Sequence, residues 1–294
     1  LATSVRDARR KVHDEGPRVM LPDLPEDTVG WNDEGLATAL EARELAVHYG
    51  RLRAVSASLA LHSGTVVALM GRNGSGKSSL LWALQGAVAS TGVLTIGGAD
   101  PRTVSDAEAR ALVSLVPQTP SDLLYLPSVG EELRQADRES HAPAGTTRAI
   151  LDRLGAELPD DRNPRDLSEG QRLALVLAIQ LTARPTVICL DEPTRGLDYQ
   201  MKQELSRIVR QLAAAGACVV IATHDVEFTA QATDRCIVLA DGDIVADGPT
   251  RIVCCASPGF SPQVAKVFHP HDVLTVAEVA AALAAQGLTP EPAR

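Results

Sequence analysis

A glycine-rich octapeptide at residues 71–78, Gly-Arg-Asn-Gly-Ser-Gly-Lys-Ser, sets the strongest limit on the architecture of this chain. An apolar run, 65–70, precedes it, and a stretch with helical spacing begins at Lys77. Glycines, a lysine and a serine at this spacing, between a strand and a helix, are the pattern of a phosphate-binding loop. The pattern predicts a buried strand, then the glycine-rich loop, then a helix. An ordinary glycine-rich turn with an exposed lysine is the alternative, which the strand–helix frame disfavours.

The glycines, the lysine and Ser78 of the octapeptide have physical reasons to lie near a phosphate. Glycine permits the tight turn that points backbone N–H groups inward, and the N-terminus of the following helix adds positive potential. We predict that Lys77 contacts the β- and γ-phosphates, that the Ser78 hydroxyl binds Mg²⁺, and that Ser79 caps the helix. The residues predicted to surround the nucleotide are Gly71, Asn73, Gly74, Ser75, Gly76, Lys77, Ser78 and Ser79.

A second apolar run, 187–190, ends in two carboxylates, Asp191 and Glu192. Asp191 is predicted to hold Mg²⁺ through water, and Glu192 is predicted to orient and polarise the water that attacks the γ-phosphate. Acidic residues are common at strand ends, so the pair alone is weak evidence. The upstream phosphate loop makes the catalytic interpretation the favoured one.

Apolar strand-like runs and helical runs alternate on both sides of the loop, which predicts a sheet covered by helices. Between residues 119 and 181 the apolar spacing is helical throughout, which predicts a helical insertion. Its expected helices are 128–136, 146–154 and 168–181. The expected strands, besides 65–70, are 93–96, 113–116, 187–190, 218–222, 236–239 and 244–246, with a further helix at 200–215.

Three segments are expected along the chain. Residues 1–36 are rich in Pro, Gly, Asp and Glu, which is typical of a flexible linker. The folded domain is expected over 37–249, and a tail over 250–294 with one helix at 275–286. A first residue that is Leu rather than Met leads us to expect a piece of a longer chain.

The segment Leu167-Ser168-Glu169-Gly170-Gln171 opens an apolar helix just upstream of the paired acids. It resembles the LSGGQ signature of ABC ATPases, which in that family contacts the γ-phosphate of ATP held by a partner domain. The resemblance implies this role for Ser168, Gly170 and Gln171. Glu169 departs from the family's middle glycine, which puts into question how well this signature supports hydrolysis in the partner's site. Read alone, the segment would be an ordinary helix cap formed by Ser168.

Other elements of the family pattern follow in order over residues 42–249. Tyr49 is similar to the aromatic residue that stacks on adenine, although a tyrosine packed on the sheet would look the same. Gln118 resembles the glutamine that senses Mg²⁺. Asp198, in Gly-Leu-Asp, resembles the D-loop aspartate, and His224 resembles the switch histidine that bonds the γ-phosphate. The resemblance thus implies catalytic roles for Glu192, His224 and Gln118, nucleotide contacts for Tyr49 and Asp198, and metal contacts for Ser78, Gln118 and Asp191.

The resemblance implies an α/β fold of the P-loop NTPase class and ABC type. It comprises a core with a mixed sheet, an antiparallel β subdomain and a helical insertion subdomain. The implied cofactors are ATP and Mg²⁺. An Asn-Lys-x-Asp element for reading guanine is absent from the sequence, which favours ATP over GTP.

Composition narrows the function further. The net charge of −9 disfavours nucleic acid as a partner, although a local basic groove is compatible with it. The apolar runs are much shorter than the roughly 20 residues of a membrane-spanning helix. Cys189, Cys218 and Cys236 lie in strand-like runs and are expected to be buried thiols. The adjacent Cys254 and Cys255 have no metal-ligand spacing, and a redox or metal pair is the less favoured alternative.

The insertion suggests which kind of ABC protein this is. Residues 121–125, Ser-Asp-Leu-Leu-Tyr, and 129–132, Val-Gly-Glu-Glu, resemble energy-coupling factor (ECF) importers of vitamins and metal ions, as does the tail run 260–263, Phe-Ser-Pro-Gln. The resemblance implies a peripheral ATPase on the cytoplasmic face of the membrane. Its partners would be an integral membrane subunit and a second ABC domain, identical or different and possibly fused upstream. A soluble ABC ATPase that remodels a ribosome or another macromolecule is the alternative.

Overall fold

The computed structural model describes residues 35–285, together with Val5 and Ala8. The linker expected over residues 1–36 therefore lies almost entirely outside the described residues. So does Gln286, the last residue of the helix expected in the tail.

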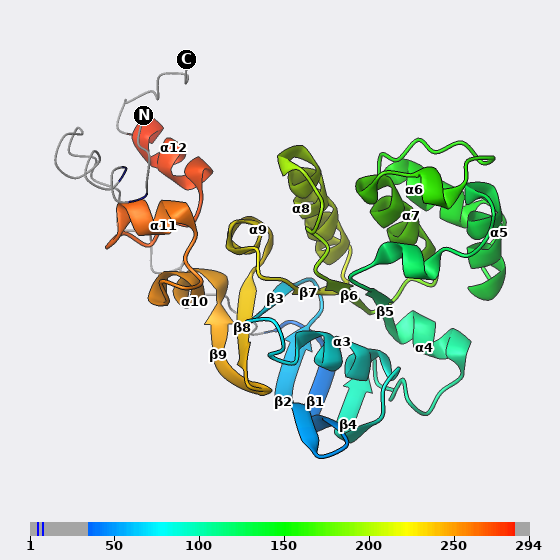
Figure 1. The fold of residues 1–294 in the computed structure, drawn as a ribbon, viewed down its shortest axis with the longest axis horizontal. Helices are drawn as coiled ribbons and strands as arrows, with labels where there is room; N and C mark the ends of the chain where they lie inside the picture. The colour runs from blue at the N-terminus through cyan, green and yellow to red at the C-terminus, as the bar shows by residue number, and fades with distance from the viewer. Residues whose placement is uncertain (1–4, 6–7, 9–34, 286–294) are drawn as a thin grey trace.

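A six-stranded mixed sheet forms the core (Figure 1). Its first five strands in spatial order are parallel, and β9 pairs with β8 in the antiparallel sense. The parallel strands are short and mostly apolar, as expected where helices or the second sheet cover both faces of a sheet. In spatial order the strands are β5 (Val113–Val116), β6 (Val187–Asp191), β7 (Cys218–Ala222), β3 (Val66–Met70), β8 (Arg235–Ala240) and β9 (Asp243–Pro249).

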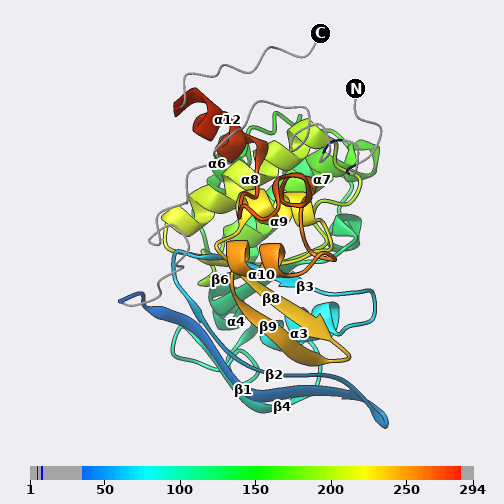
Figure 2. The same cartoon turned by 90° about the vertical axis from the view of Figure 1, so that its left-hand side faces the viewer.

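A separate antiparallel sheet has the order β2-β1-β4 and forms its own layer (Figure 2). Its strands are β1 (Thr38–Tyr49), β2 (Leu52–His62) and β4 (Ser90–Ile96). Helix α3 (Lys77–Gln85) lies between this sheet and the core, and Leu80, Leu81 and Leu84 enter one hydrophobic cluster with both sheets. The loop that starts α3 is therefore held from two sides.

Residues 119–181 contain helices and, within this described stretch, no strand. The apolar side chains of α7, among them Leu175 and Val176, pack in one cluster with β6 and β7, so the helical part lies against one face of the core sheet. The helices are η2 (Pro120–Leu123), α5 (Val129–Glu139), α6 (Thr146–Arg153), η3 (Pro164–Asp166) and α7 (Glu169–Leu181). The predicted combination of a mixed sheet, an antiparallel sheet and a helical insertion is confirmed.

The periodicity did not predict four helices. Two of them, α4 (Asp106–Leu112) and α9 (Val226–Ala232), are connections between strands of the core. In the tail the sequence predicted one helix, and the structure has α10 (Thr250–Ala256) and α11 (Gln263–Phe268) before α12 (Val276–Ala285). Each missed helix has at most seven residues, which is too short to show a 3.6-residue period. Tertiary packing selects them instead: Val253 of α10 joins a cluster with strands β3 and β8.

Helix α8 (Tyr199–Ala214) connects β6 to β7. Among the described residues no helix has the length and apolarity that crossing a bilayer requires. The three cysteines expected to be buried, Cys189, Cys218 and Cys236, are fully buried in strands. Burial raises the pKa of the Cys218 thiol to about 12, so this group is a poor nucleophile.

A buried carboxylate stabilises the helical insertion, and its removal gives a stability prediction. Asp137 of α5 accepts hydrogen bonds from the backbone N–H of Gly145, at 2.7 Å, and from the N–H and hydroxyl of Thr147, at 2.8 and 2.6 Å. Thr147 is fully buried, so without this acceptor its backbone N–H loses its partner, while its hydroxyl keeps only the contact with Thr182. Asp137→Ala is expected to lower the free energy of unfolding by about 3 kcal/mol. Urea denaturation measures this loss, and Glu139→Ala at the exposed end of α5 is the control. Equal losses in the two variants would contradict the assignment.

Candidate functional site

The glycine-rich loop runs between the end of β3 and the start of α3. Gly71 and Gly76 have positive φ, 149° and 101°, and an added Cβ would lie 2.4 Å from the carbonyl of Leu239 and 2.5 Å from that of Ala54, respectively. Only glycine fits these positions because both conformation and space exclude a side chain. Gly74 also has positive φ but open space around it. The neighbouring strands therefore determine the path of the loop backbone.

Lys77 is the first residue of α3 and is 6% exposed. Its Nζ donates to the carbonyl oxygens of Gly71, at 2.9 Å, and Arg72, at 3.3 Å, and lies 4.0 Å from Oε1 of Glu192. The ammonium group is thus held at the mouth of the loop. Ser79 was expected to cap α3, and this was wrong. Gly76 occupies the cap position without a side-chain bond, because the glycine that the loop requires also begins the helix.

Asp191 and the loop serines provide oxygen atoms that suit a divalent cation. Asp191 ends β6, is 4% exposed, and its Oδ1 has no hydrogen-bond partner among the described residues. Burial raises the pKa of this carboxyl, and the hydrogen bond with Ser78 opposes that rise. The Oγ of buried Ser75 likewise has no partner among the described residues. A buried, unpaired carboxylate oxygen beside a hydroxyl is the kind of ligand set that Mg²⁺ accepts.

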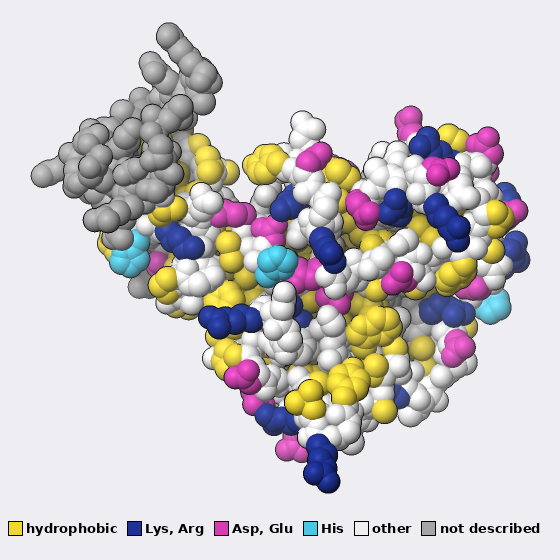
Figure 3. Space-filling model, viewed as in Figure 1, with side chains coloured by type: hydrophobic (Ala, Val, Ile, Leu, Met, Phe, Trp, Pro, Cys, Tyr) yellow, Lys and Arg dark blue, Asp and Glu magenta, His cyan; other side chains and the backbone are white. Residues whose placement is uncertain are grey.

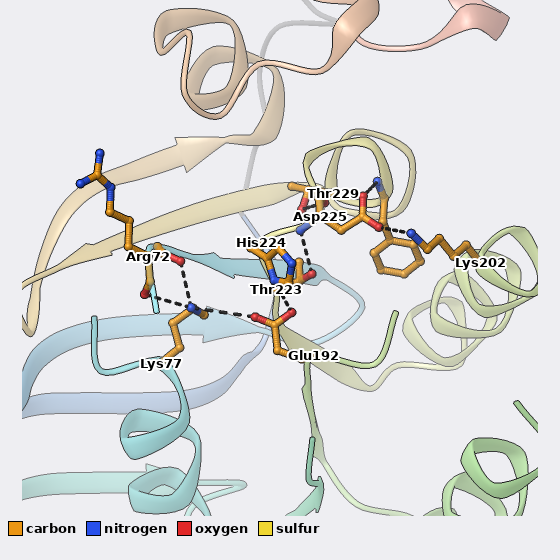
Figure 4. Close-up of polar contacts among 10 residues, drawn as sticks. Arg72, Lys77, Glu192, Lys202, Thr223, His224, Asp225 and Thr229 are labelled. Atoms are coloured by element: carbon orange, nitrogen blue, oxygen red, sulfur yellow. Dashed lines mark hydrogen bonds and ion pairs between the residues drawn. The ribbon is translucent and has the colours of Figure 1, made fainter. Parts of the chain in front are cut away.

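Glu192 and His224 contact each other where β6 and β7 end. His224 Nδ1 lies 2.8 Å from Glu192 Oε2, and the Glu192 N–H donates to the carbonyl of Ala222 at 2.8 Å. Glu192 has φ of 49°, a strained conformation for a residue with a side chain. Figure 4 shows Lys77, Glu192 and His224 directed toward one another, while the Arg72 guanidinium points away. Parallel pairing of neighbouring strands thus brings residues 77, 192 and 224 together.

A polar network that the sequence did not reveal anchors the residues on either side of His224. The Asp225 side chain caps α9 by accepting from the N–H of Phe228, at 3.0 Å, and it also accepts from Lys202 of α8 at 2.6 Å. The backbone N–H of Asp225 donates to the Thr223 hydroxyl. The resulting connections appear in Figure 4. The residue next to His224 is therefore anchored to two helices.

Most of the residues predicted to form the site line one cleft, which has a volume of about 890 Å³. Tyr49, at the end of β1, lines one part of it and is 53% exposed, so this ring is not packed away on the sheet. Gln118, just after β5, and His224 line it as well. The other predicted residues in the lining are Asn73, Gly74, Gly76, Lys77, Ser78, Ser79 and Glu192.

The signature residues lie outside this cleft. Ser168 caps α7 and forms a capping box with Gln171: its hydroxyl accepts from the Gln171 N–H at 3.3 Å, and its own N–H donates to Gln171 Oε1 at 3.0 Å. An added Cβ on Gly170 would lie 1.5 Å from the end of the Met201 side chain, so α8 packs closely against this helix. The three signature residues Ser168, Gly170 and Gln171 line a different hollow of about 240 Å³.

Asp198 and Glu169 also have local partners in this chain. Asp198 caps α8 by accepting from the Met201 N–H at 2.9 Å and does not line the large cleft. The Glu169 carboxylate accepts from Arg172 at 2.7 Å, and the carbon chain of Glu169 lies against Gly196. Glu169 is thus already paired with a cation inside its own helix.

Five residues of the cleft were not predicted: Leu52, Arg53, Ala54, Arg195 and Asp241. Residues 52–54 follow the predicted Tyr49 closely in the sequence, but no local pattern marks them, and Asp241 is far from the motifs. Arg195 lies between the paired acids and Asp198, so its place in that segment was a usable signal.

Charge elsewhere on the molecule is mixed in sign. On the face shown in Figure 3, acidic and basic side chains are interspersed. A hollow of about 990 Å³ between α8, α9 and the tail is larger than the cleft. Its basic groups are paired, Lys202 with Asp225, Arg210 with Asp234 and Arg251 with Glu278. The cleft at the glycine-rich loop is therefore the better candidate for nucleotide.

Comparison with known proteins agrees with this geometry. Residues 55–195 match the family model described as ABC transporter. A solved structure, cbiO1 from Clostridium perfringens, is described as part of the ABC transporter complex cbiONQ. It has a TM-score of 0.66 and 26% identity, over 74% of this chain and 90% of that one.

Two sequence relatives are provisionally named ABC transporter ATP-binding proteins. The one from Streptomyces coelicolor is 51% identical over 247 residues, which are 83% of this chain and 44% of the relative. The chain thus spans less than half the length of the first curated relatives that it matches. The relative from Gloeobacter violaceus is 36% identical over 201 residues, 66% of this chain and 81% of the relative. With its glycine-rich loop, paired acids and signature segment in one α/β fold, the chain belongs to the ATP-binding proteins of ABC transporters.

Proposed function

We propose that this domain binds ATP with Mg²⁺ and hydrolyses it to drive uptake of a solute across a membrane. The observation that carries the proposal is the single cleft in which the glycine-rich loop, Lys77, Gln118, Glu192 and His224 lie together. Phosphoryl transfer requires donors for the phosphates, a site for a metal and a group that orients water. This cleft contains all three kinds of group.

The binding roles follow from the loop geometry. Backbone N–H groups of residues 71–76 and the Lys77 ammonium would hold the phosphates, and the exposed ring of Tyr49 would stack on adenine. Ser78, Asp191 and Gln118 would hold Mg²⁺. When bound, this ion neutralises charge on the β- and γ-phosphate oxygens.

The catalytic roles depend on the contact between Glu192 and His224. Glu192 would orient and polarise the attacking water, because its carboxylate faces the cleft and is close to Lys77. When Nδ1 of a neutral His224 donates to this carboxylate, Nε2 is an acceptor. Donation from Nε2 to a γ-phosphate then requires a second proton on the ring or release of the Glu192 contact.

The position of the signature helix supports a partner domain. Ser168, Gly170 and Gln171 lie outside the cleft that contains Lys77, so one chain would not complete its own site. A second ABC domain, identical or different, would supply its signature to this cleft. Relatives more than twice as long as the matched region are consistent with a fused partner.

We further propose an ECF-type importer of a vitamin or metal ion, peripheral on the cytoplasmic face of the membrane. The structural likeness to cbiO1 supports this assignment. Tyr125 is 75% exposed, and the buried Glu132 holds the adjacent loop by accepting from the Leu126 N–H at 2.7 Å. An exposed aromatic ring on a fixed loop that follows Gln118 in the chain is suited to contact a membrane subunit. The average negative charge disfavours nucleic acid as a partner.

Fractionation of cells that express the full-length protein tests the transporter assignment. We expect the protein to sediment with membranes, and Tyr125→Ala to reduce its membrane-bound fraction about tenfold, because hot-spot aromatic residues dominate interface energies. ATP affinity of the same variant is the control and should be unchanged. Sedimentation with ribosomes instead of membranes would overturn the proposal and favour a soluble remodelling ATPase.

A further inference from the structure

Arg195 is shared by the nucleotide cleft and a smaller cavity beside it. The first has a volume of about 890 Å³, and the second has about 330 Å³ and is also lined by Glu169 and Leu197. The Arg195 N–H donates to the Glu192 carbonyl at 3.2 Å, which closes a turn. The turn keeps the arginine next to Glu192 while its side chain is exposed.

The guanidinium of Arg195 has no hydrogen-bond or ion-pair partner among the described residues. The other two basic side chains of the cleft are engaged. Arg53 pairs with Asp243 at 2.6 Å, and Lys77 donates to two loop carbonyls. Arg195 is thus the basic lining residue with all of its side-chain donors available within the described structure.

Glu169, which faces the smaller cavity, is the rival partner for this guanidinium. Its carboxylate already accepts from Arg172 at 2.7 Å, with the carboxylate side chain 52% exposed. A charge that is paired and half-exposed gains little from a second cation, because solvent screens the interaction. The free donors of Arg195 are therefore better matched by an anion in the cleft.

We propose that Arg195 binds the terminal phosphate of ATP, as a second side-chain cation beside Lys77. This inference rests on the proposed nucleotide-binding function. A planar guanidinium with five N–H donors matches phosphate oxygens, and its contact is charge-assisted. Arg195 and Glu192 belong to one turn, and both line the cleft. It contributes to selection of ATP over ADP, because ADP lacks the phosphate that it binds.

Binding titrations of the 294-residue chain test the proposal, with a non-hydrolysable ATP analogue and ADP as probes in the presence of Mg²⁺. Arg195→Ala is expected to weaken the ATP analogue roughly tenfold and ADP less than about twofold. Arg195→Lys is expected to restore part of the loss, because it keeps the charge without the fork of donors. Arg207→Ala, which removes an exposed arginine paired with Glu204 on α8, is the matched control.

Two outcomes would overturn the role of Arg195. One is an equal change for the ATP analogue and ADP, which would indicate a structural effect. The other is a loss that disappears in the Glu169→Gln background, which would show that Arg195 acts as the counter-ion of Glu169. Failure of the wild-type chain to bind either nucleotide would instead contradict the proposed function. Tight wild-type binding that is unchanged in Arg195→Ala would reject this inference alone.

Discussion

Lys77→Ala is expected to weaken ATP binding by about 100-fold, equivalent to roughly 3 kcal/mol. The ammonium group is buried and is held by two loop carbonyls at the mouth of the cleft. Alanine removes the cation that faces the phosphates and also leaves the carbonyls of Gly71 and Arg72 without this donor. The loop backbone would then present acceptors, rather than a cation, to an anion.

Isothermal titration with the non-hydrolysable ATP analogue measures this loss. Lys266→Ala in the tail helix α11 is the control, because it removes one positive charge far along the chain from the loop. An affinity in Lys77→Ala equal to that of the control would mean that the phosphate loop is assigned incorrectly. Circular dichroism of both variants separates a binding defect from loss of the fold.

Glu192→Gln is expected to retain ATP binding and to lower the rate of hydrolysis by about 100- to 1,000-fold. Glutamine preserves the volume of the side chain and can still bond Nδ1 of His224. It loses the charge that polarises water. With a competent partner domain present, the variant should accumulate as a dimer that encloses nucleotide, since each domain's signature lies outside its own cleft.

Phosphate release under single-turnover conditions measures the chemical step, and size-exclusion chromatography with ATP measures the dimer. Glu139→Gln, at the exposed end of α5, changes the same functional group away from the cleft and should turn over at the wild-type rate. Wild-type turnover in Glu192→Gln would remove this residue from the mechanism.

Several features of the site were predictable because they are local in sequence. The loop at 71–78 lies between a strand and a helix, as its spacing predicts, and Asp191 ends a buried strand that Glu192 follows. Ser168 begins α7 and Asp198 begins α8, which their preference for helix caps also favours. In each case short-range backbone chemistry determines the structure.

Other features were invisible because they depend on contacts between distant segments. The path of the loop depends on the carbonyls of Leu239 and Ala54, and the anchoring of Asp225, next to His224, depends on Lys202 of another helix. The helices α10 and α11 are too short for a periodic signal, and α10 forms where Val253 packs on the core strands.

The sequence by itself determined the class of the fold and the kinds of chemical group in the site, because hydrophobic period, glycine spacing and capping residues act over a few positions. The tertiary structure alone decided which groups meet. Parallel pairing of β3, β6 and β7 brings Lys77, Glu192 and His224 together, and the separation of α7 from that cleft leaves the signature residues facing elsewhere. Packing also removes Lys77 and Asp191 from solvent. Arg195 stays exposed, and its side-chain donors have no partner in the described structure. The distances between these groups, and their burial from solvent, depend on how distant segments pack together, so no single segment of the sequence determines them.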